Sequence, residues 1–322
     1  MKKSFLLKVL TTPLLCILFV VNVSAQTYPI KPIKLIVPFA PGGPIDQTAR
    51  IISQTLSDLW AQPVVIENRT GANGAIAAES VARSPADGYS LLFSVIHHTV
   101  LPSLKIKLSY DFEKDFIPIT SVAVYPIILV VNSKSPIKNI QELINLAKTK
   151  SLTFGHSGYG GGTYLAAELF NMQANVELKD IPYKGSAPAM ADLLGGHVDV
   201  MFSDAPTALS QIQSGKLRAL ALSTSGLNKL VPNLPTFAES GFPKYNAYSW
   251  GGISVVNGTP KEIVSKLNHD IVQSINEPST REKLLQIGAE PLPSSREQYA
   301  SMIQSEILKW AEVVNQRNIK IN

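Results

Sequence analysis

The chain has 322 residues, of which 45% are hydrophobic and 16% are charged, and its formal net charge is +5. The first 25 residues contain three lysines and no acidic residue, so the remainder carries 26 basic against 24 acidic residues and is nearly neutral. No block of Lys and Arg interleaved with aromatic residues occurs, which argues against a nucleic-acid partner. A chain of this length and mixed composition favours two α/β domains over one.

The first 25 residues have the pattern of an export signal. Lysines precede an apolar run, and Val23, Ser24 and Ala25 fit the end of a signal peptide. A retained membrane anchor is the alternative, but the apolar run is short and is interrupted by Pro13 and polar residues. A lipoprotein acylated at Cys16 is disfavoured, because a bulky leucine precedes this cysteine and apolar residues continue beyond it. Cleavage after Ala25 would give an exported protein without cysteine, and therefore without disulfides.

Residues 35–50 predict an apolar strand, a Pro/Gly turn and a helix with apolar residues at helical spacing. Gly42 and Gly43 let the main chain approach a ligand closely, and Pro44 suits the first helical position. The free N–H groups of such a helix start can bind an anion. Asp46 would repel an anion at close range, so we interpret it as a brace for the turn. The alternative is an ordinary corner between a strand and a helix.

Residues 62–94 predict a strand, a glycine-containing turn, a helix and another strand, which is the rhythm of a parallel sheet. Ligands of such sheets bind beyond the carboxyl ends of the strands, so the loops after Phe39, Asn68 and Phe93 are candidates. His97 and His98 follow the third loop. No metal-binding spacing accompanies them, and we expect solvated or capping histidines rather than a metal site.

A second βα series is expected after a crossing between the domains. Strands are expected near 127–131, 152–155, 176–183, 198–203 and 219–223, and helices near 141–148, 163–172, 187–194 and 207–213. The chain is expected to return at 248–255, and apolar stripes over 263–275 and 299–314 predict C-terminal helices. The predicted domains are 26–123 with 249–322, and 124–248.

Residues 154–163 again join a strand to a helix through a glycine-rich loop, with hydroxyls at Ser157 and Thr163. A phosphate-binding GxxxxGK[ST] loop would need Lys at Gly161, and the dinucleotide pattern GxGxxG begun at Gly158 fails at Thr163. Nucleotide binding is therefore disfavoured. The loop remains rich in backbone donors and is suited to an anion.

Several motifs follow one another along the chain: VPFAPGG at 37–43 with Asp46, ENR at 67–69, PADGY at 85–89, YD at 110–111, PYKG at 182–185, GGHVD at 195–199 and WGG at 250–252. In these motifs the chain resembles the Bug-type (TctC-like) periplasmic solute-binding proteins of tripartite tricarboxylate transporters. The likeness extends over essentially the whole chain after the signal.

The resemblance implies a two-domain α/β clamshell that closes on a small mono- or dicarboxylic acid, with a ligand cleft between the domains and two crossover segments. It implies a carboxylate gripped by the two glycine-rich loops, without a cofactor or metal. Ser94, Tyr183 and Asp204 are further candidates because each ends or follows a predicted strand. The expected ligand-binding residues are Phe39, Pro41, Gly42, Gly43, Asp46, Ser94, Ser157, Gly158, Gly160, Thr163, Tyr183 and Asp204.

The expected partners are the ligand and the membrane subunits of the transporter, and the expected state is a monomer. A sensory role, in which the bound ligand is presented to a membrane receptor, would use the same fold. A periplasmic hydrolase is a weaker alternative, because no GxSxG elbow or similar signature occurs.

Departures from the family pattern affect the choice of ligand. Gly161 and Gly162 stand where relatives often have Ser or Thr, and Tyr164 stands where they often have His. These changes suggest altered polar contacts and room for a bulkier acid. The alternative is that Tyr164 packs in a helix interface, and Trp250 is expected to pack near the hinge.

Overall fold

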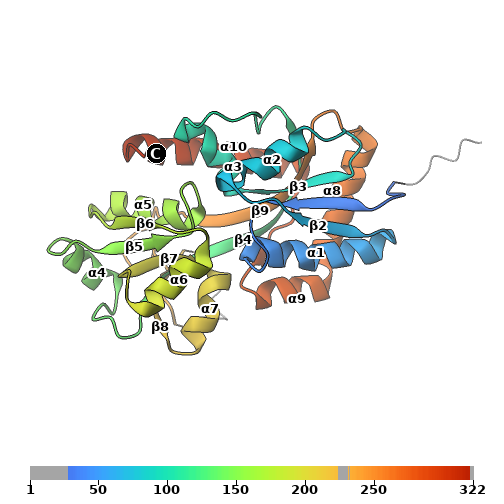
Figure 1. The fold of residues 1–322 in the computed structure, drawn as a ribbon. Coiled ribbons are helices and arrows are strands. Elements are labelled where there is room, and N and C mark those ends of the chain that lie inside the picture. The colour runs from blue at the N-terminus through green and yellow to red at the C-terminus, as the bar shows by residue number, and fades with distance from the viewer. Residues whose placement is uncertain (1–27, 224–230, 232, 320–322) are drawn as a thin grey trace, which may run out of the picture.

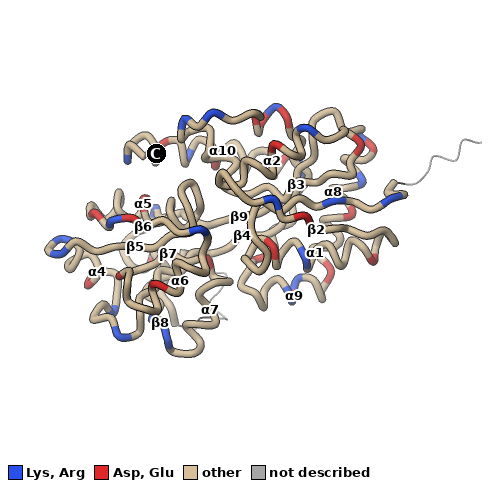
Figure 2. The backbone as a smooth tube through the Cα atoms, in the orientation of Figure 1, with Lys and Arg blue, Asp and Glu red and all other residues tan. Residues whose placement is uncertain are grey.

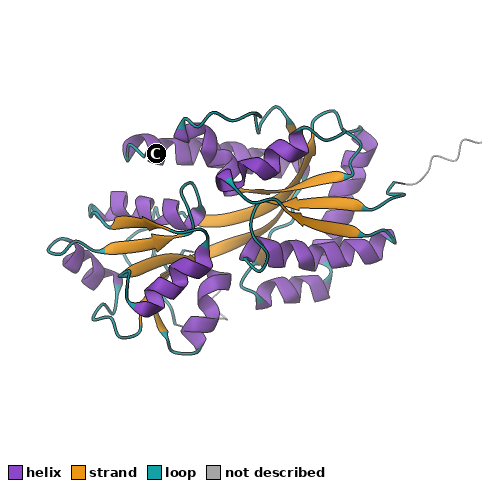
Figure 3. Ribbon diagram, viewed as in Figure 1, coloured by secondary structure: helices purple, strands orange, loops and turns teal. Residues whose placement is uncertain are grey.

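The computed structural model describes residues 28–223, 231 and 233–319, and Figure 1 shows them as two lobes joined by long strands. The predicted signal peptide lies outside the described residues. In Figure 2, basic and acidic residues are interspersed over both lobes. Figure 3 shows helices on both sides of the strands, as the predicted α/β class requires.

The first lobe is built on three parallel strands and one antiparallel strand. In spatial order these are β2 (Val64–Asn68), β1 (Ile33–Val37), β3 (Ser90–Val95) and β9 (Tyr248–Val256). Its helices are α1 (Pro44–Trp60), α2 (Ala75–Ala82), α3 (Ile96–Val100), α8 (Lys261–Asn276), α9 (Pro278–Gln286) and α10 (Arg296–Gln316), with short 3₁₀ turns at Ala72–Gly74 and Leu101–Leu104.

The second lobe repeats the βα pattern. Its strands are β5 (Thr153–His156), β6 (Lys179–Pro182), β7 (Val200–Asp204) and β8 (Leu217–Leu222), and its helices are α4 (Ile140–Ala147), α5 (Gly162–Ala174), α6 (Ser186–Gly195) and α7 (Ala205–Gln213). β6, β5 and β7 are parallel neighbours. The predicted strand at 176–183 is shorter than expected.

One strand, β4 (Phe116–Asn132), passes through both lobes. Its first part pairs with β9 and with the short β10 (Glu290–Pro291), and its last part pairs with β7 and β8, all antiparallel. We expected a crossing segment near 119–126, ahead of a separate strand at 127–131. The strand instead accommodates Pro118 next to a shift in register, as prolines in strands usually require.

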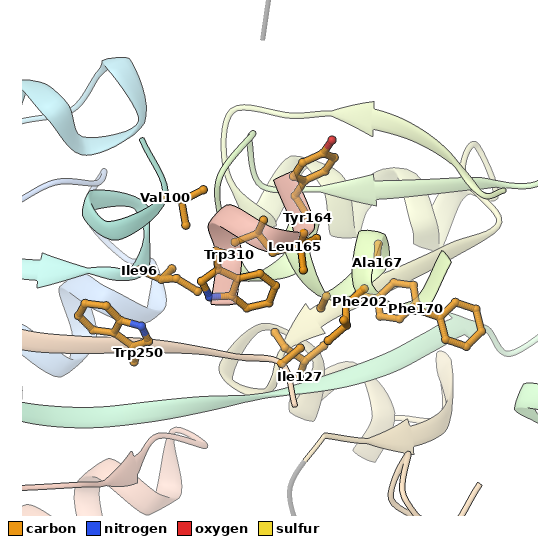
Figure 4. Close-up of a cluster of buried hydrophobic side chains, with 14 of the residues drawn as sticks. Ile96, Val100, Ile127, Tyr164, Leu165, Ala167, Phe170, Phe202, Trp250 and Trp310 are labelled. Atoms are coloured by element: carbon orange, nitrogen blue, oxygen red, sulfur yellow. The ribbon is translucent and has the colours of Figure 1, made fainter. Parts of the chain in front are cut away.

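An apolar core continues beneath the crossing. Figure 4 shows side chains from the first lobe and the second lobe in one cluster, which includes Trp250 and Trp310. Trp250 is fully buried, as predicted, and its indole N–H donates to the Glu306 carboxylate of α10 at 3.2 Å. The labelled members are Ile96, Val100, Ile127, Tyr164, Leu165, Ala167, Phe170, Phe202, Trp250 and Trp310.

Candidate functional site

The loop between β1 and α1 ends in a helix start without a side-chain cap. Gly42 has φ +87°, and Gly43 is the N-cap residue in an extended conformation (φ −75°, ψ 170°). Pro44 occupies the first turn and has no N–H to satisfy. The N–H groups of the following residues have no partner within the helix, so this end is a ready acceptor of an anion.

Asp46 braces this turn, as we interpreted from the sequence. Its carboxylate accepts hydrogen bonds from the N–H of Gly42 at 2.9 Å, from the Asn68 amide at 2.9 Å and from Arg50 at 2.8 and 3.1 Å. Burial alone would raise the pKa of Asp46, but these hydrogen bonds outweigh it and lower the pKa. The Asn68 amide also donates to the Phe39 carbonyl at 2.8 Å, which ties the loop to β2.

The loop between β5 and α5 is shaped by its own side chains. The Ser157 N–H donates to Thr163 Oγ1 at 3.2 Å, and the two hydroxyls are 2.9 Å apart. The N–H of Gly158, at φ +129°, donates to His156 Nδ1 at 3.3 Å. Gly161 is the N-cap of α5 in an extended conformation, again without a side-chain cap. The free N–H groups therefore belong to the first turn of α5.

The two loops meet at His97 of α3. The Phe39 ring packs edge-on against the imidazole, with 4.9 Å between ring centroids. A Cβ added to Gly161 would lie 2.8 Å from His97 Nε2. Asn73 Oδ1 and the Leu104 side chain of the first lobe approach the same glycine-rich loop of the second lobe. The β1–α1 loop and the β5–α5 loop are far apart in the sequence, and both thus lie against His97.

The two histidines have different environments, and both are buried. His98 accepts a hydrogen bond from the Val95 N–H at 3.2 Å, and its Nε2 lies 3.2 Å from the Gly74 carbonyl, so capping is confirmed for this residue. His97 is 7% exposed, and its buried Nδ1 has no hydrogen-bond partner among the described residues. The expectation of a solvated histidine is wrong for both, because α3 places both side chains beneath the neighbouring loops, where they are buried.

Two of the expected site residues have side chains engaged elsewhere. The Ser94 hydroxyl is fully buried and lies 2.8 Å from the Tyr299 hydroxyl and 3.0 Å from that of Ser254. The Tyr183 hydroxyl donates to Asp192 at 2.5 Å, while its ring is half-buried. The structure does not bring either side chain to the meeting point of the loops.

Asp204 lies at the end of β7, paired in register with Ile127 of β4. The Ser249 hydroxyl of β9 donates to Asp204 Oδ1 at 2.5 Å. Burial raises the pKa of Asp204 to about 6, and the hydrogen bond from Ser249 offsets only part of this shift. Ser249 also lies against Gly162, where it would meet an added Cβ. Asp204 is therefore linked to the start of α5 through Ser249.

Tyr164 is a buried packing residue beside β5 and the β5–α5 loop. It is 5% exposed, its ring lies 4.7 Å from that of His156 and 5.2 Å from that of Tyr159, and burial raises its pKa. This arrangement matches the alternative in which Tyr164 is a packing residue.

Sequence reasoning did not single out three polar residues beside this region. Ser249 is one, and the others are Thr48 on α1 and Tyr125 on β4, whose side chains are both buried. Tyr125 and Ser249 are paired in register on β4 and β9. The available signal was a polar residue in each predicted crossing, Tyr125 in the first and Ser249 in the second. Neither crossing by itself shows that the two residues are paired.

The chain matches the family described as "Tripartite tricarboxylate transporter family receptor" (TctC) over residues 48–319. The chain belongs to this family. Among its relatives, protein BugT of Bordetella pertussis is 37% identical over 303 residues, which cover 93% of each chain. The predicted resemblance is therefore confirmed, and the protein is a solute-binding protein of the TctC and Bug type.

Solved structures of TctC-type relatives support the two-lobed fold. The R. palustris protein Rpa4515 with adipate is 35% identical, with a TM-score of 0.86 over 91% of this chain and 99% of that one. MatC from Rhodopseudomonas palustris, with bound malate, is 31% identical, with a TM-score of 0.81 over 89% of this chain and 100% of that one. Both relatives bind carboxylates. The predicted clamshell class is confirmed.

No helix within 28–223 or 233–319 is long and apolar enough to cross a membrane. In the same residues, no group of three or more His, Cys, Asp or Glu side chains could hold a metal ion.

Proposed function

We propose that this protein binds a small mono- or dicarboxylic acid between its two lobes and delivers it to the membrane subunits of a tripartite tricarboxylate transporter. The relatives with adipate and malate support the class of ligand. The family description supports the transporter as the partner. We further infer that the chain is exported and cleaved after Ala25, and that the moving bodies are residues 26–123 with 249–322, and 124–248.

One observation supports the position of the binding site. Two helix starts without side-chain caps, at Gly43 and Gly161, come from opposite lobes, and both loops contact His97. A micromolar affinity needs about −8 kcal/mol. One helix start supplies roughly 0.3–2 kcal/mol and a charged hydrogen bond roughly 1.5–3 kcal/mol, so one loop would be too weak. Two loops acting on one carboxylate would be sufficient.

The test is to titrate adipate and malate into the purified protein by calorimetry, and to identify by mass spectrometry any acid that copurifies. Gly43→Val fills the space above the start of α1, where an added Cβ would meet only the Ala40 carbonyl at 3.8 Å, so it should abolish binding without unfolding the protein. Ala187→Val adds the same kind of bulk at an exposed position and is the control. Wild-type affinity in the Gly43 variant would place the site elsewhere.

A further inference from the structure

His97 is a buried side chain with one ring nitrogen that has no hydrogen-bond partner among the described residues. It is 7% exposed, and the nitrogen in question is Nδ1. The adjacent His98 is buried as deeply but is bonded to Val95 and Gly74. Hydrogen bonds therefore account for the burial of His98 but not for that of His97.

The position of the ring proton follows from the surroundings of the two nitrogens. Burial, with a smaller contribution from His98, lowers the pKa of His97 to about 3, so the imidazole is neutral at pH 7 and carries one proton. A buried N–H without a partner is rarer in proteins than an unpaired acceptor. We therefore assign the proton to Nε2 and leave the buried Nδ1 as a bare acceptor.

Nε2 lies beside the uncapped start of α5. It lies 2.8 Å from the position that a Cβ of residue 161 would occupy. The Phe39 ring packs against the imidazole from the β1–α1 loop, which holds the ring in this orientation. Glycine at 161 thus leaves room for the imidazole at the helix start.

We propose that His97 is a ligand-binding residue, whose Nε2–H donates a hydrogen bond to the carboxylate held at the start of α5. This inference rests on the proposed function and adds a side-chain donor to its backbone donors. A hydroxyl side chain at position 161 could donate a hydrogen bond to the ligand. With glycine at 161, Nε2–H of His97 would donate that hydrogen bond instead. Because the helix start and Nε2–H offer donors only, the site would select an ionised carboxylate over the corresponding carboxamide.

The test uses three variants of His97, with adipate and malate as probes in calorimetry. His97→Leu removes both nitrogens and should weaken binding about tenfold or more, the usual effect of losing a hydrogen bond to a charged group. His97→Gln places an amide N–H close to the position of Nε2 and should stay within about threefold of wild type. His97→Asn places its amide near Nδ1 and should bind as weakly as the leucine variant.

His98→Leu is the matched control, because it changes a neighbouring, equally buried histidine. It should lower the melting temperature, since it breaks the contacts with Val95 and Gly74, and leave the affinity of the folded protein unchanged. His97→Leu should show the opposite pattern: weaker binding with an unchanged or higher melting temperature in the free protein.

The outcomes separate the two proposals. If wild type binds neither acid nor any copurifying one, the proposed function fails and this inference fails with it. If wild type binds and His97→Leu binds equally well, only the inference is overturned. Equal affinities of the Gln and Asn variants would overturn the assignment of the donor to Nε2.

Discussion

At the scale of single residues, Asp204 predicts how stability depends on pH. Burial raises its pKa from 3.8 to about 6 in the folded protein, whereas the unfolded chain keeps a value near 3.9. Above pH 6 the carboxylate is ionised in both states, and its burial destabilises the fold. As pH falls from about 6 to 4, the folded protein takes up the proton first, so the free energy of unfolding rises by about 3 kcal/mol.

Asp204→Asn should remove this contribution, because the amide stays neutral and its oxygen still accepts from Ser249. The variant should be more stable than wild type at pH 7–8, by at most about 3 kcal/mol, and the difference should vanish near pH 4. Urea unfolding of both proteins between pH 4 and 8 measures this difference. A constant difference across the range would contradict the raised pKa.

Single residues also differ in whether the sequence alone could indicate their role in the site. The role of Asp46 follows from local chemistry, because a carboxylate in the first turn of a helix meets the turn's own N–H and the Arg one turn later. His97 could not be inferred in this way. Its burial depends on Phe39 and Gly161, which are remote from it in the sequence and from each other.

At the scale of elements, the start of α5 is fitted tightly against β9. A Cβ on Gly162 would collide with Ser249 Oγ and lie 3.1 Å from its Cα. Gly162→Ala should therefore lower the free energy of unfolding by about 1–3 kcal/mol, although alanine is the better helix former. Gly43→Ala is the control at the start of α1, where space is open, and should cost at most about 1 kcal/mol. Equal losses in urea unfolding would refute tight packing at Gly162.

Long elements were predictable because their apolar residues recur at the period of the structure. The apolar stripe of 263–275 appears as α8, and that of 299–314 appears as α10. Short or irregular elements were not predictable. α3 has only five residues, too few for a periodic signal, and β4 continues past two prolines because β9 lies alongside and its register shifts near Pro118.

At the scale of the whole molecule, residues of the two lobes contact each other near the proposed ligand site. Gly158 of the second lobe lies near Asn73 of the first lobe. Gly160 of the second lobe likewise lies near Val100 and Leu104 of the first lobe. The C-terminal end of α10 adds ion pairs from Arg317 to Glu168 at 2.7 Å and to Glu177 at 2.9 Å, both in the second lobe. The repeated βα series predicted two lobes, but the sequence could not show which helix spans both.

Closure is the prediction that belongs to this scale. A ligand can shift the lobes only if it binds the closed form better than the open one, and a carboxylate that contacts both helix starts does so because its second set of hydrogen bonds requires closure. Burial of the anion then strengthens those bonds. Adipate or malate, whichever binds, should reduce the radius of gyration measured by solution scattering. It should also raise the melting temperature with concentration, with about 2.7 kcal/mol of stabilisation at 100 times the dissociation constant. Gly43→Val should show neither effect. A scattering profile unchanged at saturation, with binding verified by calorimetry, would mean that the site is preformed and that the lobes do not close on the ligand.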